Sequence, residues 1–366
     1  MKGKEDSVRS ILMNGVRKGV FPGAVLLAAH GHDIVLIEVA GNRSLSPDDF
    51  PMNGDTIFDL ASLTKPLATS LALMKLVDEQ SLSLDQPLET LLSVSLPLSK
   101  KSLTCRQILS HSAGFPAWKP YYEDLVKFRP DQRKSMVRRW ILDSELVYPP
   151  GRDALYSDLG FIILEWVVEE LAGMALDLFV EGIFRRHLLL DNTFLGNPMI
   201  KGDHTEEDFA ATERCKWRKR VMRGEVHDEN AFALGGFSGH SGLFGPVRDV
   251  YKIVDLLREH YAGLRQDVFK PDTVREFFTK QKESESFTWA LGWDTPSRGN
   301  SSSGRHFHPG SVGHLGFTGT SMWLDLEQNV IVVLFTNRVH PTRNNLKIKE
   351  FRPLLHDAVM ETLGCV

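Results

Sequence analysis

Ser62 and Lys65 are the two residues of this sequence whose types and spacing most directly suggest chemistry. They stand in the run Ser62-Leu63-Thr64-Lys65, at the head of an almost wholly apolar stretch, residues 62–77, which predicts a buried helix. A three-residue step on a helix places both side chains on one face, so the lysine ammonium can reach the serine hydroxyl. Because a serine hydroxyl is a weak nucleophile at neutral pH, it needs such a neighbour. The pair predicts that Ser62 is a nucleophile activated by Lys65.

The same S-x-x-K pattern is short enough to occur by chance. Its alternative interpretation is a serine that caps a helix, followed by a lysine whose charge reaches solvent. The apolar residues around Lys65 argue against this alternative, because a lysine that heads a buried helix needs a partner for its charge.

Tyr156 and Asp158 form a second group with chemical potential, in the run Tyr156-Ser157-Asp158 that precedes a predicted helix. A tyrosine close to a lysine can have its pKa lowered and serve as a general base. The alternative is a core tyrosine whose hydroxyl is satisfied by hydrogen bonds. Tyr156 is therefore a candidate catalytic residue only together with Ser62 and Lys65.

A third group lies at residues 314–319, His314-Leu315-Gly316-Phe317-Thr318-Gly319, where the sequence leads into a predicted strand. Gly316 would let a substrate lie close to the strand edge. The backbone N–H of Phe317 is a candidate second donor, after that of Ser62, for an oxyanion hole. The H-x-G pattern is weak evidence for a site by itself, and it is informative only because of its position in the chain.

Strand patterns occur near both ends of the chain. Residues 23–29 and 34–39 are apolar runs separated by a turn, which predicts a β-hairpin, and residues 321–325 and 330–336 predict two further strands. The last stretch, residues 346–363, predicts a helix that Pro353 should interrupt or restart.

The middle of the chain has the pattern of helices, over residues 103–110, 133–143 and 159–171, and a further amphipathic helix is predicted over 247–261. Strands from both ends can bury their apolar faces by pairing in one antiparallel sheet. The expected fold is therefore α/β, with an antiparallel sheet flanked by terminal helices and a mostly helical domain inserted into it. The expected boundaries are residues 1–61 and 235–366 for the sheet domain and 62–234 for the insertion, with the active site at the seam.

Composition restricts the function classes. The 366 residues carry a net charge of −4 with 42% hydrophobic and 25% charged residues, which is typical of a folded globular protein and gives no footprint for nucleic acid. The basic run at residues 216–223 is interpreted as a solvated helix face. Three cysteines without metal spacing predict no disulfide framework. No secretory signal or membrane segment is recognisable, so a cytoplasmic location is expected, or a periplasmic or extracellular one if a leader was removed.

These groups, in this order and with these gaps, resemble the serine β-lactamase-like family, which includes class C β-lactamases, low-molecular-weight penicillin-binding proteins, D-amino-acid-specific peptidases and related esterases. Further matching segments extend the resemblance over nearly the whole chain. They are Phe21-Pro22-Gly23-Ala24, Leu109-Ser110-His111-Ser112-Ala113-Gly114, Pro149-Pro150-Gly151, Gly242-Leu243-Phe244 and Ala290-Leu291-Gly292-Trp293.

The resemblance implies an acyl-enzyme mechanism. Ser62 would attack the substrate carbonyl, Tyr156 with Lys65 would move protons, and the N–H groups of Ser62 and Phe317 would hold the oxyanion. Water would then release the acyl group, and no cofactor or metal is implied.

Two departures from the family pattern bear on the substrate. His314 stands where many relatives carry lysine, and because histidine is only partly charged near pH 7, its hold on a substrate carboxylate should be weak and pH-dependent. Asp158 stands where most relatives carry asparagine; an ionised aspartate only accepts hydrogen bonds. We therefore expect Asp158, His314 and Gly316 to be substrate-binding residues, with Asp158 either paired with Lys65 or favouring a substrate that carries an amine.

Residues 220–231, 235–242 and 337–341 resemble a subgroup linked to peptidoglycan turnover, some of whose members are fused to, or encoded with, glycosidases that act on cell-wall amino sugars. This resemblance points to muropeptides or D-amino-acid derivatives. A metal site at His227, Asp228 and Glu229, with His240 or His308, is the less favoured interpretation of that region, and a hydrogen-bonded loop that braces the pocket is preferred.

The sequence thus predicts a serine hydrolase of amide or ester bonds, of the D-Ala carboxypeptidase, D-aminopeptidase or esterase type. One alternative is a weak β-lactamase or promiscuous carboxylesterase; another is a catalytically quiet protein that binds penicillin or muropeptides. The expected partners are a small-molecule or muropeptide substrate and, as possible ligands, β-lactams, with no nucleic acid.

Overall fold

A six-stranded antiparallel sheet is the structural base of the protein. The computed structural model describes residues 2–45, 49–197, 204–282 and 287–366. The sheet has the order β3-β2-β1-β11-β10-β9, so strands from the two ends of the chain pair at its centre, β1 with β11. The strands of this sheet are β1 (Gly23–His30), β2 (Asp33–Ser44), β3 (Phe50–Pro51), β9 (Val312–Leu315), β10 (Ser321–Asp325) and β11 (Val330–Thr336).

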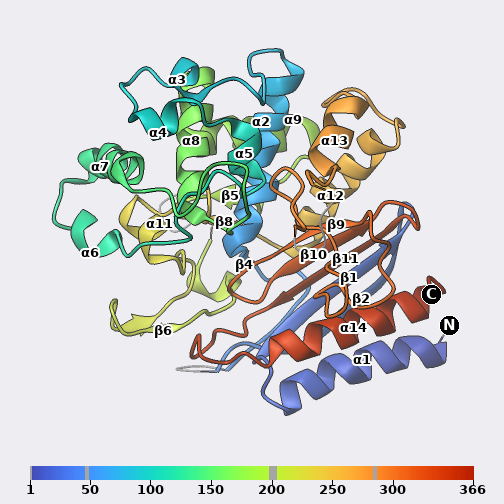
Figure 1. Cartoon of the computed structure of the whole chain (residues 1–366). Helices are drawn as coiled ribbons and strands as arrows, with labels where there is room; N and C mark the ends of the chain where they lie inside the picture. The colour runs from blue at the N-terminus through green and yellow to red at the C-terminus, as the bar shows by residue number, and fades with distance from the viewer. Residues whose placement is uncertain (1, 46–48, 198–203, 283–286) are drawn as a thin grey trace.

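Two helices from opposite ends of the chain cover one face of this sheet (Figure 1). They are α1 (Lys2–Arg17), which the sequence patterns did not predict, and α14 (Ile348–Leu363). The prediction that Pro353 interrupts the last helix was wrong, because Pro353 lies inside α14. The opposite face of the sheet packs against α12 (Val247–Tyr261), which spans the residues that its apolar periodicity predicts.

The middle of the chain is largely helical, as predicted. Its helices are α2 (Leu71–Asp78), α3 (Leu88–Leu91), α4 (Leu98–Lys101), α5 (Cys105–Leu109), α6 (Tyr122–Leu125), α7 (Pro130–Asp143), α8 (Asp158–Ala172), α9 (Leu176–His187) and α11 (Glu229–Ala233), and α13 (Pro271–Phe278) follows α12. Helix α8 begins at a Ser157 side-chain cap and ends at Gly173 in the left-handed conformation, which is the stop that the sequence predicts.

Two small sheets complete the fold. The first has the order β4-β8-β5, from β4 (Phe58–Asp59), β8 (Leu243–Gly245) and β5 (Phe194–Leu195), and the second is the hairpin of β6 (Arg214–Cys215) and β7 (Arg220–Val221). The basic run 216–223 therefore lies in and beside the turn of a hairpin, and its interpretation as a helix face was wrong. The loop residues between these short strands place Trp217 at the surface, with 37% of its area exposed.

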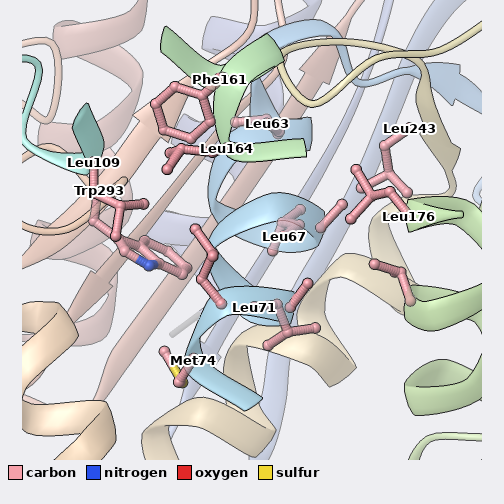
Figure 2. Close-up of a cluster of buried hydrophobic side chains, with 14 of the residues drawn as sticks. Leu63, Leu67, Leu71, Met74, Leu109, Phe161, Leu164, Leu176, Leu243 and Trp293 are labelled. Carbon is pink, nitrogen blue, oxygen red and sulfur yellow. The ribbon is translucent and has the colours of Figure 1, made fainter. Parts of the chain in front are cut away.

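The largest apolar core surrounds the segment that follows Ser62 (Figure 2). Leu67 and Leu71 are fully buried, and Phe161 and Leu164 of α8 pack beside them together with Trp293. Burial of a leucine-sized side chain contributes about 1.5–3 kcal/mol, so this cluster fixes the segment that carries Ser62 and Lys65 with little freedom. All three cysteines are buried and unpaired. None of the helices in the described part of the chain combines the length and the apolar composition that a bilayer crossing requires.

Candidate active site

The segment that carries Ser62 begins the buried stretch, but it is not one regular helix as predicted. A 3₁₀ turn (Ala61–Leu63) is followed by a π-helical segment (Lys65–Ser70) and only then by α2. Pro66 stands at the start of the π-helical segment. The predicted contact between the Lys65 ammonium and the Ser62 hydroxyl is nevertheless present, with Lys65 Nζ 3.2 Å from Ser62 Oγ. π-Helical turns are rare in proteins as a whole, and those that occur are often found at functional sites.

The residue before the nucleophile candidate has an unusual backbone. Ala61 has a φ of +48°, a region that non-glycine residues seldom adopt, and the buried Asp59 carboxylate accepts a hydrogen bond from its N–H at 2.8 Å. The other oxygen of Asp59 accepts from the His227 N–H at 2.6 Å. Asp59, which sequence reasoning missed, thus joins the turn before Ser62 to the loop at His227.

Lys65 is fully buried, and the structure places its ammonium within 3.3 Å of Asp158, Ser62 and a backbone carbonyl oxygen. Its Nζ atom lies 2.6 Å from Asp158 Oδ1, 3.2 Å from Ser62 Oγ and 3.3 Å from the carbonyl oxygen of His240. Burial lowers the pKa of Lys65, but the opposing effects of Asp158 and Tyr156 outweigh it and the pKa is raised. The predicted pairing of Asp158 with Lys65 is therefore present, and the lysine is an ammonium at neutral pH.

Tyr156 lies over this ammonium, with Lys65 Nζ 4.7 Å from the centre of its ring, and its hydroxyl is hydrogen-bonded to Lys65 and to Ser62. Lys65 lowers the pKa of Tyr156 as expected, but the net pKa is raised in the resting site, contrary to the expectation. Burial raises the pKa more than Lys65 lowers it, and Asp158 raises it further. Lys65 and Tyr156 therefore both keep their protons before substrate arrives.

His111 holds the segment that carries Tyr156. Its Nδ1 accepts a hydrogen bond from the Ser157 N–H at 3.0 Å, and its carbonyl oxygen accepts from the Leu155 N–H and from the Tyr148 hydroxyl, each at 3.0 Å. Its ring lies 4.7 Å from that of Tyr156. Burial, followed by the Lys65 charge, keeps the pKa of His111 well below its usual value, so the ring is neutral. The sequence segment 109–114 was matched to the family without a role for this histidine.

His314 lies in β9 itself, opposite Met322 of β10, and not in a loop that leads to the strand. Its Nδ1 lies 2.9 Å from the carbonyl oxygen of Leu315. Burial lowers the pKa of His314 to about 3, and the Lys65 charge contributes to the same effect. The expectation that His314 is partly charged near pH 7 was therefore wrong. Its neutral ring carries no charge with which to attract a carboxylate.

Gly316 is needed by the packing of the fold. A Cβ atom at Gly316 would lie 2.0 Å from Thr320 Oγ1 and 2.6 Å from the carbonyl oxygen of Leu60, which is too close for any other residue. The close approach that the sequence predicts at Gly316 is thus made by the protein's own backbone beside Ser62. The role of Gly316 in substrate binding stays a prediction.

Phe317 follows this strand with 49% of its area exposed. Arg338 fixes its backbone by donating hydrogen bonds to its carbonyl oxygen, one of them at 3.0 Å from Nε. Ser62 and Phe317 line the same two cavities, so the structure brings together the two residues whose N–H groups were predicted to hold an oxyanion. That function stays a prediction.

The two cavities differ in charge. The first, of about 350 Å³, is lined by Trp118 and by the carboxylates of Asp158, Asp228 and Glu229, after which we call it the acidic cavity. Each of these carboxylates is paired with a cation: Lys65, His240 and Arg343 respectively, of which the last two also line the cavity. The second, of about 420 Å³, contains no carboxylate except Asp294 and is lined by three cations. These cations are Arg338, Lys349 and Arg352. Ser62 and Tyr156 line both cavities, so the nucleophile candidate lies where an acidic and a basic cavity meet.

The residues considered for a metal site are engaged with other partners. His227 Nε2 lies 3.1 Å from Glu213, Glu229 is paired with Arg343, and His308 is paired with Glu327. Asp228 and His240 lie 3.0 Å apart and share a cluster with Asp158. Because Lys65 and His240 already supply positive charge to this cluster, its residues fit the hydrogen-bonded brace that was preferred.

The family model described as beta-lactamase matches residues 8–355 of the chain. The chain belongs to the beta-lactamase family. It is 31% identical over 351 residues to a protein of Escherichia coli O157:H7 named "Putative D-alanyl-D-alanine carboxypeptidase", with 87% of this chain and 79% of that protein covered. A protein of the same name from Salmonella agona is 32% identical over 361 residues, with 90% and 81% covered.

Solved structures with low sequence identity share the fold of this chain. EstCE1, described as a hydrolase with promiscuous acyltransferase activity, superposes with a TM-score of 0.75 at 21% identity and 98% coverage of both chains. An octameric penicillin-binding protein homologue from Pyrococcus abyssi has a TM-score of 0.75 at 20% identity, with 98% of this chain and 77% of that chain covered. Within this family, the chain has a mixed α/β fold with an antiparallel sheet, as predicted.

Proposed function

We propose that this protein is a serine hydrolase that forms an acyl-enzyme on Ser62 and removes a carboxyl-terminal D-amino acid from peptides derived from peptidoglycan. The observation that carries the proposal is the contact of Ser62 with Lys65 and Tyr156 at the junction of the two cavities. The names of the relatives at 31–32% identity, D-alanyl-D-alanine carboxypeptidases, support the same reaction.

The first step is attack of Ser62 Oγ on the carbonyl carbon of the scissile bond. Because Lys65 and Tyr156 both hold their protons tightly, the reactive form is the one in which this pair has lost one proton. The pair then takes the Ser62 proton and delivers it to the leaving amine as the amide bond breaks. The N–H groups of Ser62 and Phe317 stabilise the oxyanion. In the second step, water attacks the ester on Ser62 and the acid is released.

Arg352 is the group that we assign to the substrate carboxylate. It is 5% exposed, it lines the basic cavity, and its Nε atom is buried without a hydrogen-bond partner. Burial, followed by repulsion from Arg338, lowers the pKa of Arg352 to about 10. No carboxylate of the described residues forms an ion pair with Arg352. A substrate carboxylate would therefore pair with the buried Arg352 cation. His314 cannot take this role because its ring is neutral.

The test is release of D-alanine from a peptide that ends in D-Ala-D-Ala. Ser62→Ala should abolish release. Arg352→Gln should raise KM about tenfold to a hundredfold, the size expected for a lost charge-assisted hydrogen bond, while turnover of a p-nitrophenyl ester that lacks a carboxylate stays within twofold. Arg352→Lys, which keeps the charge, should restore part of the affinity. If the peptide is not cleaved while the ester is, the carboxypeptidase assignment is wrong.

An esterase is the second candidate. His314, which lines the basic cavity together with Ser62, favours it, since its neutral ring does not select for a carboxylate. The name of EstCE1 is consistent with this candidate but is matched at only 21% identity. Ester turnover that exceeds peptide turnover in kcat/KM by orders of magnitude, without an effect of Arg352→Gln, would favour the esterase.

A further inference from the structure

A chain of aromatic side chains leads from the acidic cavity onto the surface. Trp118 lines that cavity with Ser62 and is 43% exposed. Its ring lies 6.5 Å from that of Tyr122, which lies 4.8 Å from that of Trp217, which in turn lies 5.7 Å from that of Phe232. Trp217 is 37% exposed. We call Trp118, Tyr122 and Trp217 the aromatic strip.

Two segments far apart in the sequence supply the strip: the loop that leads into α6, with the first residue of that helix, and the turn between β6 and β7. Figure 1 shows α6, α11 and the β6 hairpin on the same side of the molecule. Large exposed aromatic rings that gather from separate segments mark binding surfaces more often than they mark chance exposure. Continuity with the cavity of Ser62 makes the substrate itself the expected occupant.

Buried polar groups hold the strip rigidly. The fully buried Asn230 of α11 accepts from the Tyr122 N–H at 2.8 Å and donates to the Lys119 carbonyl oxygen at 2.9 Å. Arg218 donates to the carbonyl oxygens of Val226 at 2.6 Å and His227 at 2.9 Å, which ties the hairpin to the wall of the cavity. A strip that is fixed before binding loses little conformational entropy when a ligand covers it.

The polar groups beside the rings restrict the chemistry of the ligand. The Tyr122 hydroxyl donates to the exposed Glu123 at 3.3 Å, so hydrogen-bonding groups stand at the edge of an aromatic surface. A pyranose ring matches this arrangement, because its axial C–H bonds can pack on an aromatic face while its hydroxyl and amide groups bond to side chains at the edge. A purely aliphatic acyl chain would use the rings but would leave the polar edge unused.

We infer that the aromatic strip binds a sugar ring attached to the acyl side of the substrate, so that the preferred substrate is a glycopeptide and not the free peptide. This inference rests on the proposed function, in which the basic cavity holds the carboxylate of the leaving amino acid. Because Ser62 lines both cavities, the acyl side of the scissile bond then extends into the acidic cavity. The strip begins in the acidic cavity, and so it continues the acyl side of the bound substrate.

The experiment compares two substrates that differ only in the sugar: a peptide ending in D-Ala-D-Ala, and the same peptide linked to the disaccharide of N-acetylglucosamine and N-acetylmuramic acid. The parent protein should cleave the glycopeptide with a kcat/KM about threefold to tenfold above that of the peptide. Trp217→Leu, which keeps an apolar side chain but removes the ring, should abolish this ratio without changing cleavage of the free peptide. Trp217→Phe should keep most of it.

Binding of the free disaccharide, followed by quenching of tryptophan fluorescence, gives a readout that does not depend on catalysis. Trp217→Leu should remove the quenching, and Trp166→Leu, on α8 under Arg138, is the matched control that should keep it. Equal kcat/KM for both substrates, together with no quenching, would overturn the sugar site. Quenching without cleavage of either substrate would support the sugar site and show that the proposed function is wrong. Loss of free-peptide cleavage in Trp217→Leu would contradict the separation of the strip from the reacting centre.

Discussion

Asp158 is the residue at which this chain departs most consequentially from the sequence motif that it resembles. The motif has asparagine at this position, whereas here a carboxylate lies 2.6 Å from the buried Lys65 ammonium. The pair is compensated, because neither charge is left alone in the low-dielectric interior. Its consequence for chemistry is that the proton is held more tightly on Lys65 and also on Tyr156.

Asp158→Asn should therefore move the pH dependence of kcat/KM to lower pH. Asp158 raises the pKa of Lys65 and of Tyr156, so its removal lets burial lower the first and leaves less to raise the second. The reactive form, which has lost one proton, then forms at a lower pH. Profiles of ester turnover from pH 6 to pH 10 for the parent and Asp158→Asn check this. Superimposable acidic limbs, where activity rises as the pair loses its proton, would contradict the role given to Asp158.

Sequence patterns predicted which candidate residues lie together, but predicted their electrostatics poorly. Ser62 and Lys65 meet because their short spacing constrains the local geometry, whereas the approach of Tyr156 was expected from the family resemblance. Asp59 and Arg352 carried no recognisable pattern, and His111 lay in a matched segment without an assigned role, since each acts through contacts with residues far away in the sequence. The pKa directions of Tyr156 and His314 depend on burial, which only the folded chain defines.

Helix α8 connects the reacting centre to the loop that faces it. Its first turn carries Asp158, and two turns later the buried Glu165 accepts hydrogen bonds from Ser238 Oγ at 2.5 Å and from the Gly239 N–H at 2.9 Å. Thr69 donates to the Gly239 carbonyl oxygen at 2.6 Å. The carbonyl oxygen of His240, which Lys65 contacts, is held in place by this clamp.

Glu165→Gln should destabilise the protein by about 3 kcal/mol, because it leaves Lys134 without one carboxylate and weakens two hydrogen bonds of a buried group. Denaturation by urea measures the change in the free energy of unfolding. Glu169→Gln, which removes the other, more accessible carboxylate at Lys134, is the matched control and should cost less. Equal losses for both variants would contradict a clamp centred on Glu165.

The bounds of the helices and strands show where apolar periodicity is enough to predict an element. Helix α12 and the strands β10 and β11 have the bounds that their patterns predict, because each has one strongly apolar face or run. The nucleophile segment does not, since an apolar stretch gives no signal that separates α, 3₁₀ and π geometry. Pro353 is accommodated within α14, against the rule that proline breaks a helix interior.

At the scale of the whole molecule, the protein buries several histidines in neutral form. Burial lowers the pKa of His314 and of His356 to about 3 and keeps that of His111 well below its usual value. In the unfolded chain these rings titrate near pH 6.5, so below that pH the unfolded state binds more protons than the folded state.

The free energy of unfolding should therefore fall as the pH drops below about 6.5. Each buried neutral histidine costs about 1.4 kcal/mol per pH unit until its own folded-state pKa is reached. Urea denaturation at pH 7.5, 6.0 and 5.0 gives the slope, and His356→Phe, far from the reacting residues in the sequence, should make it shallower. A free energy of unfolding that is constant over this range would contradict neutral burial of these rings.

The division of the chain at residues 62 and 234 remains a proposal about domains. The sheet joins both ends of the chain, and Ser62 lies at its border with the helices, where the two cavities open. This placement requires long-range pairing of β1 with β11, which alternating and apolar runs at the two ends of the sequence indicate.

The most direct test of the account is the site of covalent labelling by a fluorophosphonate, read by mass spectrometry of the intact protein and of its peptides. One label per molecule is expected, on the peptide that contains Ser62, with loss of ester turnover in proportion to labelling. Ser62→Ala should remain unlabelled, and Ser241→Ala, which alters another serine of the same cavity, should label normally. Absence of labelling, or a label on Ser241 that persists in Ser62→Ala, would contradict Ser62 as the nucleophile.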